Sequence, residues 1–257
     1  MHLDMPIETL KTHYERKYSR EGFTSSIESI RKVHSPTSRF EAVVKFFPKY
    51  FKGGAILELG AGNGNVAKTL LSSEMMVTSY TLSDISLPRI EGLRNNLKDS
   101  RVSVLDMDAE DIPESEYGKY DAVIMIALIE HLIDPLGSMQ RIRQLLKPNG
   151  FVYIDTPNIA TYTRRAKLIL GKFPSTASKN EGLTTYSGEP VDLYDEGHLH
   201  YFTYRSLSLM LTQRCGFSRV VKLAYPGGKA LLGIHMHNFL AAIWPEMFSE
   251  LVVLAYA

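Results

Sequence analysis

Between residues 54 and 156, five short apolar runs are separated by longer stretches, and this alternation constrains the fold more than any other feature of the sequence. The runs predict strands at 55–59, 77–82, 102–107, 120–126 and 151–155. Between them, amphipathic patterns predict helices at 65–71, 87–97 and 135–146, the last ending at Lys147-Pro-Asn-Gly150. Strands that alternate with helices form right-handed βαβ units, with helices on both faces of a parallel sheet. We therefore expect a doubly wound α/β fold.

The flanking regions extend this core to a mostly parallel sheet of seven strands. Two further strands are predicted at 217–224 and 251–256, and a helix at 204–214 has Thr203 as its N-cap. Two more helices are predicted near the start of the chain, at 7–18 and 39–47. We expect one domain over 1–257, divided into an N-terminal helical cap (1–50), a cofactor-binding core (51–156), a lid insertion (157–200) and a C-terminal part of the sheet with an apolar insertion (201–257).

Composition narrows the classes of partner. The formal net charge is +1, which argues against nucleic acid and against an acidic membrane surface. The single cysteine, Cys215, excludes an internal disulfide framework and fits a reducing compartment. No apolar run reaches the ~18 residues that a membrane span requires, and the first residues do not resemble a signal peptide. We expect a cytoplasmic protein, and the sequence leaves its oligomeric state open.

The strongest local motif is the glycine loop Glu58-Leu-Gly-Ala-Gly-Asn-Gly64 at the end of the first strand. Its glycines let the backbone turn tightly and approach a ligand closely. A dinucleotide fingerprint would require a glycine where Asn65 stands. A carboxylate at Glu58 would repel a pyrophosphate, whereas it would suit a ligand that carries ammonium and sulfonium cations.

This loop resembles the first motif of class I S-adenosylmethionine-dependent methyltransferases, which reads E-x-G-x-G-x-G. The resemblance continues in order over roughly residues 50–157 and fades beyond them. Its further elements are Asp84 after the second strand, Asp108-Ala-Glu-Asp-Ile-Pro113, Ile126-Ala-Leu-Ile-Glu-His-Leu132 and Leu145-Leu-Lys-Pro-Asn-Gly-Phe151, where Asn149 replaces a glycine. The resemblance implies a Rossmann-like methyltransferase fold and S-adenosylmethionine as the cofactor.

The resemblance also implies roles for single residues. In the family, the acid after the second strand binds both ribose hydroxyls, and the first acid and alanine after the third strand lie against the adenine. The predicted cofactor-binding residues are Glu58, Gly60, Ala61, Gly62, Gly64, Asp84, Ile85, Asp108, Ala109 and Ile126. Each acid also has a simpler explanation, as a helix N-terminal acid, a solvated turn residue or a surface carboxylate.

Two histidines are candidates for catalysis, because a hydroxyl acceptor must lose a proton and histidine is the usual base near neutral pH. His131 follows the fourth strand. His200 lies in 196–207, which resembles the H-x-x-F-F-T-x-x-S-L element of a subgroup that includes methyltransferases of ubiquinone biosynthesis. Both histidines, and His198 beside them, could instead be structural.

A metal site is a weaker hypothesis. In the related small-RNA 3′-terminal methyltransferases, an E-x-x-E-H pattern and a later histidine bind a divalent cation. Glu130, His131 and His200 match three of those positions, but Ala127 replaces the first glutamate. We therefore expect no metal.

The function predicted from these features is transfer of a methyl group from S-adenosylmethionine to a small-molecule acceptor, with oxygen favoured as the target atom. Closure of the 157–200 insertion as a lid would complete the acceptor pocket, because the insertion leaves the end of the fifth strand. Two alternatives stay open: a nicotinamide-dependent oxidoreductase, and a non-catalytic module that binds S-adenosylmethionine.

Overall fold

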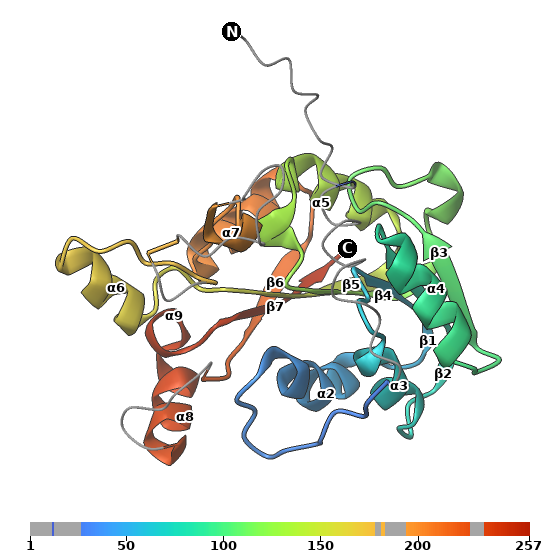
Figure 1. Cartoon of the computed structure of the whole chain (residues 1–257), viewed down its shortest axis with the longest axis horizontal. Coiled ribbons are helices and arrows are strands. Elements are labelled where there is room, and N and C mark those ends of the chain that lie inside the picture. The colour runs from blue at the N-terminus through green and yellow to red at the C-terminus, as the bar shows by residue number, and fades with distance from the viewer. Residues whose placement is uncertain (1–11, 13–26, 178–180, 183–193, 227–233) are drawn as a thin grey trace, which may run out of the picture.

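The fold is built on one seven-stranded sheet, seen edge-on in Figure 1. The computed structural model describes residues 12, 27–177, 181–182, 194–226 and 234–257. The strands are β1 (Gly54–Leu59), β2 (Val77–Asp84), β3 (Val102–Asp106), β4 (Tyr120–Ile126), β5 (Leu146–Thr156), β6 (Arg219–Leu223) and β7 (Leu251–Tyr256). Their order across the sheet is β3-β2-β1-β4-β5-β7-β6. The prediction of a doubly wound, mostly parallel sheet is confirmed.

The direction of the strands identifies the edge where a ligand would bind. β1 to β5 pair in parallel, and β7 runs antiparallel to both of its neighbours, β5 and β6. The chain order runs outward from β1 through β2 to β3, and from β4 it continues in the other direction. In open α/β sheets a crevice forms at such a switch point, outside the carboxyl ends of the strands. Here the switch point lies between β1 and β4.

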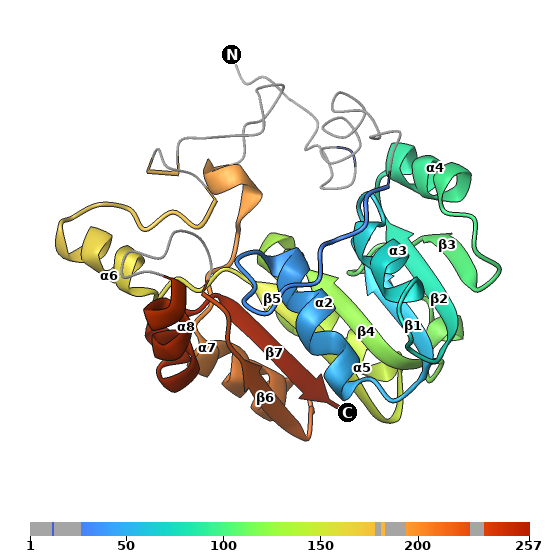
Figure 2. The same ribbon diagram turned by 90° about the horizontal axis from the view of Figure 1, so that it is seen from below.

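Helices cover both faces of the sheet. The α-helices are α2 (Arg39–Tyr50), α3 (Asn65–Leu71), α4 (Leu87–Asn96), α5 (Pro135–Gln144), α6 (Tyr162–Ile169), α7 (Tyr204–Leu209), α8 (Ile234–Ile243) and α9 (Pro245–Phe248). The shorter turns are η1 (Glu114–Glu116), η2 (Ile129–His131), η3 (Tyr194–Gly197) and η4 (Met210–Arg214). Figures 1 and 2 show α2 and α3 on one face of the sheet and α5 and α7 on the other.

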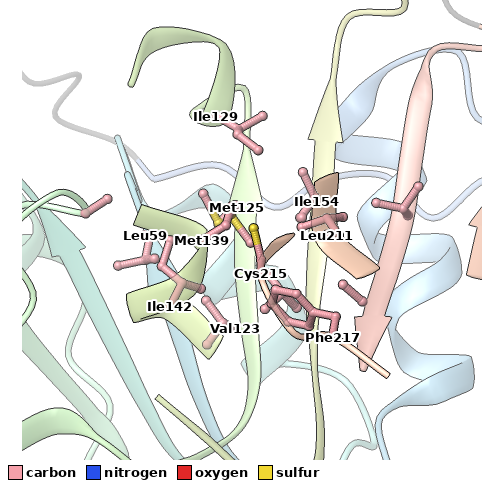
Figure 3. Packing of buried hydrophobic residues seen from close by; sticks show 14 of the residues in the cluster. Leu59, Val123, Met125, Ile129, Met139, Ile142, Ile154, Leu211, Cys215 and Phe217 are labelled. Carbon is pink, nitrogen blue, oxygen red and sulfur yellow. The ribbon is translucent and has the colours of Figure 1, made fainter. Parts of the chain in front are cut away.

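Each face has its own hydrophobic core, because side chains of a strand point alternately to opposite sides. On one side, Val123 and Met125 of β4 pack with Met139 of α5 and Leu211 of η4 (Figure 3). Cys215 is buried in this core. On the other side, Ala122 and Ile124 of β4 pack with the apolar stripes of α2 and α3.

Most predicted elements between 54 and 156 are present within one or two residues of the expected bounds. The fifth strand is the exception, because it begins at Leu146 and includes the predicted turn. Leu146 already pairs with Tyr120, and the register then shifts before Phe151 pairs with Ala122. Asn149 has a φ of 66°, so a turn conformation does occur within these bounds.

The flanks differ more from the predictions. The helix expected at 39–47 continues to Tyr50 through Pro48, with Phe46 and Phe47 buried against the sheet. The helix expected at 204–214 is α7 followed by the π-helical η4, and Thr203 caps α7 as predicted. β6 is shorter than expected, and α8 and α9 occupy the apolar segment before β7. The helix predicted at 7–18 lies outside the described residues except for residue 12.

The insertion at 157–200 begins and ends against the sheet. Asn158 forms a parallel bridge with Phe202, and the Ile159 N–H donates to the Phe202 carbonyl over 3.0 Å. α6 projects at one end of the molecule, beside α8 and α9 (Figures 1 and 2). Residues 178–180 and 183–193 lie outside the described part, so closure of a lid stays a prediction. Among the residues that the structure does describe, no helix is long and apolar enough to cross a membrane.

Candidate functional site

A pocket lies at the carboxyl ends of β1, β2, β3 and β4, which is the edge that the strand order indicates. We call it the strand-end pocket. Its lining residues are Gly60, Gly62, Ser83, Asp84, Ile85, Arg89, Met107, Asp108, Ala109, Glu110, Ala127, Leu128, His131 and Leu132. The lining combines acids, one arginine and one histidine with apolar side chains. This mixture is typical of a site for a small organic ligand.

The glycine loop forms one wall of the strand-end pocket. Gly60, Gly62 and Gly64 have φ values of 68°, 56° and 77°, in the left-handed region that favours glycine. Gly64 is also the N-cap of α3. A Cβ atom added to Gly62 would lie 2.7 Å from Nη1 of Arg89, so a side chain would take space beside the pocket. The loop therefore needs glycine for its backbone conformation, and at position 62 also to leave space for Arg89.

Asp84, at the end of β2, fixes the glycine loop through hydrogen bonds. Its Oδ2 accepts a hydrogen bond from the Gly62 N–H and its Oδ1 accepts one from the Ser86 N–H, each over 3.0 Å. Burial raises the pKa of Asp84, although the two backbone hydrogen bonds oppose this shift. A carboxylate oxygen can accept a second hydrogen bond. The side chain can thus hold the loop and still bind ligand hydroxyls.

Glu58 lies behind the pocket and not in its lining. The side chain is 4% exposed, and its Oε2 accepts a 2.6 Å hydrogen bond from the Tyr80 hydroxyl. Burial raises the pKa of Glu58 to about 8, so the folded chain holds this group mostly protonated near neutral pH. The surface-carboxylate explanation is therefore wrong. Pairing of the Glu58 carboxylate with a cationic ligand stays a prediction.

The turn after β3 forms the opposite wall. The Asp108 carboxylate accepts a 2.8 Å hydrogen bond from the Glu110 N–H, so a local turn presents Ala109 to the pocket. The Glu110 carboxylate in turn accepts from the Ile133 and Asp134 N–H groups over 3.0 and 2.7 Å. These bonds fix the turn after β3 to the segment after β4.

The segment after β4 turns sharply at Ala127, whose φ of 50° is unusual for a residue with a Cβ atom. The turn brings η2 over the pocket, and His131 joins the lining. Nδ1 of His131 lies 3.0 Å from the Gly197 carbonyl oxygen. The rings of His131 and His198 meet edge to face, with their centroids 4.7 Å apart. The return of the insertion therefore contacts the pocket through His198.

The structure separates the two predicted catalytic histidines. His131 lines the pocket, whereas His200 lies outside the lining and its Nε2 is 3.3 Å from the Ile133 carbonyl oxygen. Among the predicted cofactor-binding residues, Gly60, Gly62, Asp84, Ile85, Asp108 and Ala109 line the pocket. Ala61, Gly64 and Ile126 support it from adjacent positions in the chain, and Glu58 lies behind it.

Sequence reasoning missed several residues of the site. Arg89, which the sequence analysis did not name, enters the pocket from α4. His198, which the sequence analysis considered structural, contacts His131 in place of the predicted His200. Glu130, His131 and His198 each offer a ligand atom, and these atoms lie within 4.8 Å of one another. The H-x-H spacing at 198–200 was the available signal, but it does not decide which histidine faces inward.

The chain is similar to known methyltransferases. The methyltransferase domain family matches residues 32–222. Ubiquinone biosynthesis O-methyltransferase of Xanthomonas oryzae pv. oryzae is 28% identical over 109 residues, which are 41% of this chain and 44% of that protein. The enzyme of the same name from Bordetella pertussis is 29% identical over 108 residues, with the same coverage. The match thus spans less than half of these curated relatives.

Solved structures show a similar fold. An S-adenosylmethionine-dependent methyltransferase from Archaeoglobus fulgidus has a TM-score of 0.55 at 15% identity, covering 84% of this chain and 92% of that one. One from Thermotoga maritima, described as a possible histamine N-methyltransferase, has a TM-score of 0.54 at 15% identity, with coverages of 85% and 88%. These likenesses concern the fold alone.

Proposed function

The chain belongs to the methyltransferase domain family, and from this premise we propose that it transfers a methyl group from S-adenosylmethionine to an oxygen atom of a small-molecule acceptor. The observation that carries the proposal is the composition of the strand-end pocket. A left-handed glycine loop, a buried acid at the end of β2 and a histidine after β4 all line one cavity at the switch point of the sheet.

The residues present fit S-adenosylmethionine, whose sulfonium supplies an electrophilic methyl group. At Gly62 an added Cβ atom would crowd the Arg89 guanidinium, which also lines the pocket. In this proposal Asp84 accepts hydrogen bonds from the ribose hydroxyls, and Asp108 and Ala109 hold the adenine. Gly60 and Gly62 let the methionine portion approach the backbone. The positive charge of Arg89 opposes the rise in the pKa of Asp84. Arg89 therefore favours the carboxylate form of Asp84, which accepts hydrogen bonds.

His131 is the proposed base. A hydrogen bond to the Gly197 carbonyl fixes the proton on Nδ1, and the lone pair of the neutral ring is then on Nε2. An acceptor hydroxyl beside the pocket would give its proton to this nitrogen as the oxygen attacks the methyl group. Much of the acceleration in such a displacement comes from alignment of the two reacting atoms. The walls of the pocket supply this alignment.

Oxygen is favoured over nitrogen or carbon because a hydroxyl needs a base and His131 lines the pocket. The names of the relatives from Xanthomonas and Bordetella, which are O-methyltransferases, support the same choice. The nicotinamide alternative is disfavoured by Asn65, which begins α3 where the dinucleotide fingerprint needs glycine.

Two measurements test the proposal. Calorimetry should show binding of S-adenosylhomocysteine and none of NAD. Incubation with methyl-labelled S-adenosylmethionine and a small-molecule extract of the source cells should then label a product that carries a new O-methyl group. Binding of NAD alone would contradict the family assignment of the pocket. Binding of S-adenosylhomocysteine without any labelled product would favour the non-catalytic alternative.

A further inference from the structure

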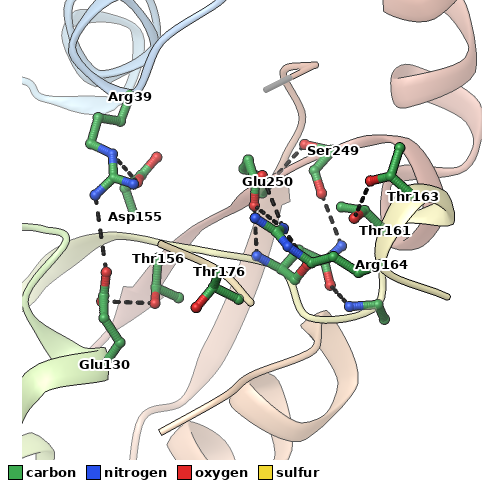
Figure 4. Close-up of polar contacts among 12 residues, drawn as sticks. Arg39, Glu130, Asp155, Thr156, Thr161, Thr163, Arg164, Thr176, Ser249 and Glu250 are labelled. Carbon is green, nitrogen blue, oxygen red and sulfur yellow. Dashed lines mark hydrogen bonds and ion pairs between the residues drawn. The ribbon is translucent and has the colours of Figure 1, made fainter. Parts of the chain in front are cut away.

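A second polar site lies beside the strand-end pocket, formed by Arg39, Glu130 and Asp155. We call it the acidic subsite. Figure 4 shows the Arg39 side chain reaching from α2 toward both carboxylates. Nη1 of Arg39 lies 4.0 Å from Oε1 of Glu130, and Nε of Arg39 lies 3.8 Å from Oδ1 of Asp155. None of these residues lines the strand-end pocket.

The acidic subsite adjoins the pocket on the side of His131. Glu130 directly precedes His131 in η2. Asp155 is paired with Ile126 at the carboxyl ends of β5 and β4, and its carbonyl oxygen accepts from the Ala127 N–H over 2.9 Å. Because Ala127 and His131 both line the pocket, the two acids stand immediately behind the wall that faces the proposed acceptor.

Each acid has one satisfied oxygen and one that has no hydrogen bond. Oε2 of Glu130 accepts from the Thr156 hydroxyl over 2.8 Å, and Oδ2 of Asp155 accepts from the Tyr225 hydroxyl over 3.1 Å. Oε1 of Glu130 and Oδ1 of Asp155 are buried without a hydrogen-bond partner. The guanidinium distances exceed those of a hydrogen bond. Leaving two buried acceptors unsatisfied is costly to the folded chain, and a ligand that donates hydrogen bonds would satisfy them.

The charge of the subsite is also unbalanced. One guanidinium faces two carboxylates, and Glu250 nearby is already paired with Arg164 over 3.0 Å. An anionic group placed here would add repulsion in a buried environment.

The members of the acidic subsite differ in exposure. The two acid side chains are 1% exposed, whereas the Arg39 side chain is 32% exposed. Arg39 is the first residue of α2, which Ser38 caps by accepting a 3.2 Å hydrogen bond from the Glu41 N–H. Arg39 is thus the most exposed member of the acidic subsite, and its two ion pairs, at 4.0 and 3.8 Å, are long.

From these observations we propose that Arg39, Glu130 and Asp155 bind the acceptor through a hydrogen-bond-donating group, either a hydroxyl or a protonated amine, and select against anionic acceptors. The proposal rests on the proposed function and adds the substrate class to it. The donated protons would reach Oε1 of Glu130 and Oδ1 of Asp155, while the methyl group is transferred to a separate oxygen near His131.

The test separates a small-molecule extract of the source cells by charge before the reaction. Anion exchange retains the anionic pool, cation exchange then retains the cationic pool, and the flow-through is neutral. With methyl-labelled S-adenosylmethionine, the wild-type protein should label the neutral or the cationic pool at least about tenfold more than the anionic pool. Label in the neutral pool identifies a hydroxyl, and label in the cationic pool identifies an amine. Predominant label in the anionic pool overturns the proposal.

Variants then separate recognition from structure. Glu130→Gln and Asp155→Asn should each raise the acceptor concentration for half-maximal labelling by roughly tenfold or more, and should leave S-adenosylhomocysteine affinity unchanged. The double variant should also lose the discrimination against the anionic pool, which a purely structural role would not change. Asp99→Asn, which removes a carboxylate that pairs with Arg101 over 2.7 Å far from the subsite, is the matched control.

If the double variant does not fold, Arg39→Gln tests the same discrimination between acceptor pools. Loss of the guanidinium makes the subsite more negative, so discrimination against the anionic pool should increase by about tenfold. Unchanged discrimination in every folded variant overturns the proposal. Failure of the wild-type protein to label any pool, although it binds S-adenosylhomocysteine, instead contradicts the proposed function on which the subsite rests.

Discussion

The strand-end pocket and the acidic subsite differ in how the chain builds them. The pocket takes its lining from short segments that each follow a strand or begin the next helix, so every wall is encoded locally. The subsite joins Arg39 of α2, Glu130 of η2 and Asp155 of β5, which come from separate parts of the sequence. Asp84 of the pocket accepts hydrogen bonds through both carboxylate oxygens, whereas each acid of the subsite keeps one buried oxygen without a hydrogen bond.

This difference indicates which of the two regions can vary in substrate specificity. A cofactor site made from local turns depends on backbone conformation, and its residues can be recognised as motifs. An acceptor site made from distant side chains can change by single substitutions without altering the sheet. Variants in each region show whether the two regions are as separable in function as they are in construction.

The largest effect is expected for Gly62→Val. A β-branched side chain strongly disfavours the φ of 56°, and its Cβ atom would lie 2.7 Å from Nη1 of Arg89. Calorimetry should detect no binding of S-adenosylhomocysteine. Gly118→Val is the matched control, because Gly118 has a φ of 68° but no atom within 4 Å of its added Cβ. Equal loss of binding in both variants would show that strain alone, and not the pocket, is responsible.

His131→Ala should have the next largest effect. Removal of the proposed base should lower turnover by about a hundredfold, with S-adenosylhomocysteine affinity nearly intact. His200→Ala should change turnover much less, because its ring faces the Ile133 carbonyl oxygen and lies outside the pocket lining. Single-turnover labelling assays measure the rate of methyl transfer in both variants. Wild-type turnover in the His131 variant would mean that alignment of the reactants or another group carries the step.

Asp84→Ala should weaken S-adenosylhomocysteine binding by about tenfold to a hundredfold, because hydrogen bonds to a charged acceptor contribute roughly 1.5–3 kcal/mol. The variant also releases the Gly62 N–H, so part of the loss comes from a looser glycine loop. Asp111→Ala, at an exposed turn acid outside the pocket lining, is the control. Affinity that is unchanged in a folded Asp84 variant would leave this acid with a structural role only.

Glu58→Gln should have the smallest effect on cofactor affinity at neutral pH, less than about threefold, because the folded chain already holds this group mostly protonated. Its effect on stability depends on pH. Burial raises the pKa of Glu58 from 4.5 to about 8. Within this window the unfolded chain loses the proton and the folded chain keeps it, so stability falls as pH rises.

Urea denaturation at about pH 5 and about pH 8 checks this expectation. The wild-type protein should lose more stability between the two values than the Glu58→Gln variant, by on the order of a few kcal/mol. Glu114→Gln, at an exposed acid in η1, should keep the wild-type dependence. Equal slopes for wild type and the Glu58 variant would contradict the buried, protonated state.

The strand pattern was enough to predict the sheet between β1 and β5, and the family resemblance implied six of the residues that line the strand-end pocket. Periodicity and turn residues act over a few positions, so they can be read from the chain directly. The same local logic explains the partial failures. Tyr120 pairs with Leu146 across the sheet, and this non-local contact extends β5 beyond the predicted turn.

Only the tertiary structure decided which side chains meet. The sequence contains His198 and His200 on equal terms, but the Leu199 and His200 N–H groups both donate to the Glu130 carbonyl, and this docking directs the His198 ring onto His131. The protonation state of Glu58 also depends on the tertiary structure, because burial beside Tyr80 makes it a mostly neutral acid and not a surface carboxylate. The pairing of Arg39 with Glu130 and Asp155 likewise depends on packing of α2 against the sheet. Burial and long-range contacts set the charge and the direction of these groups, and neither is encoded within any short segment of the chain.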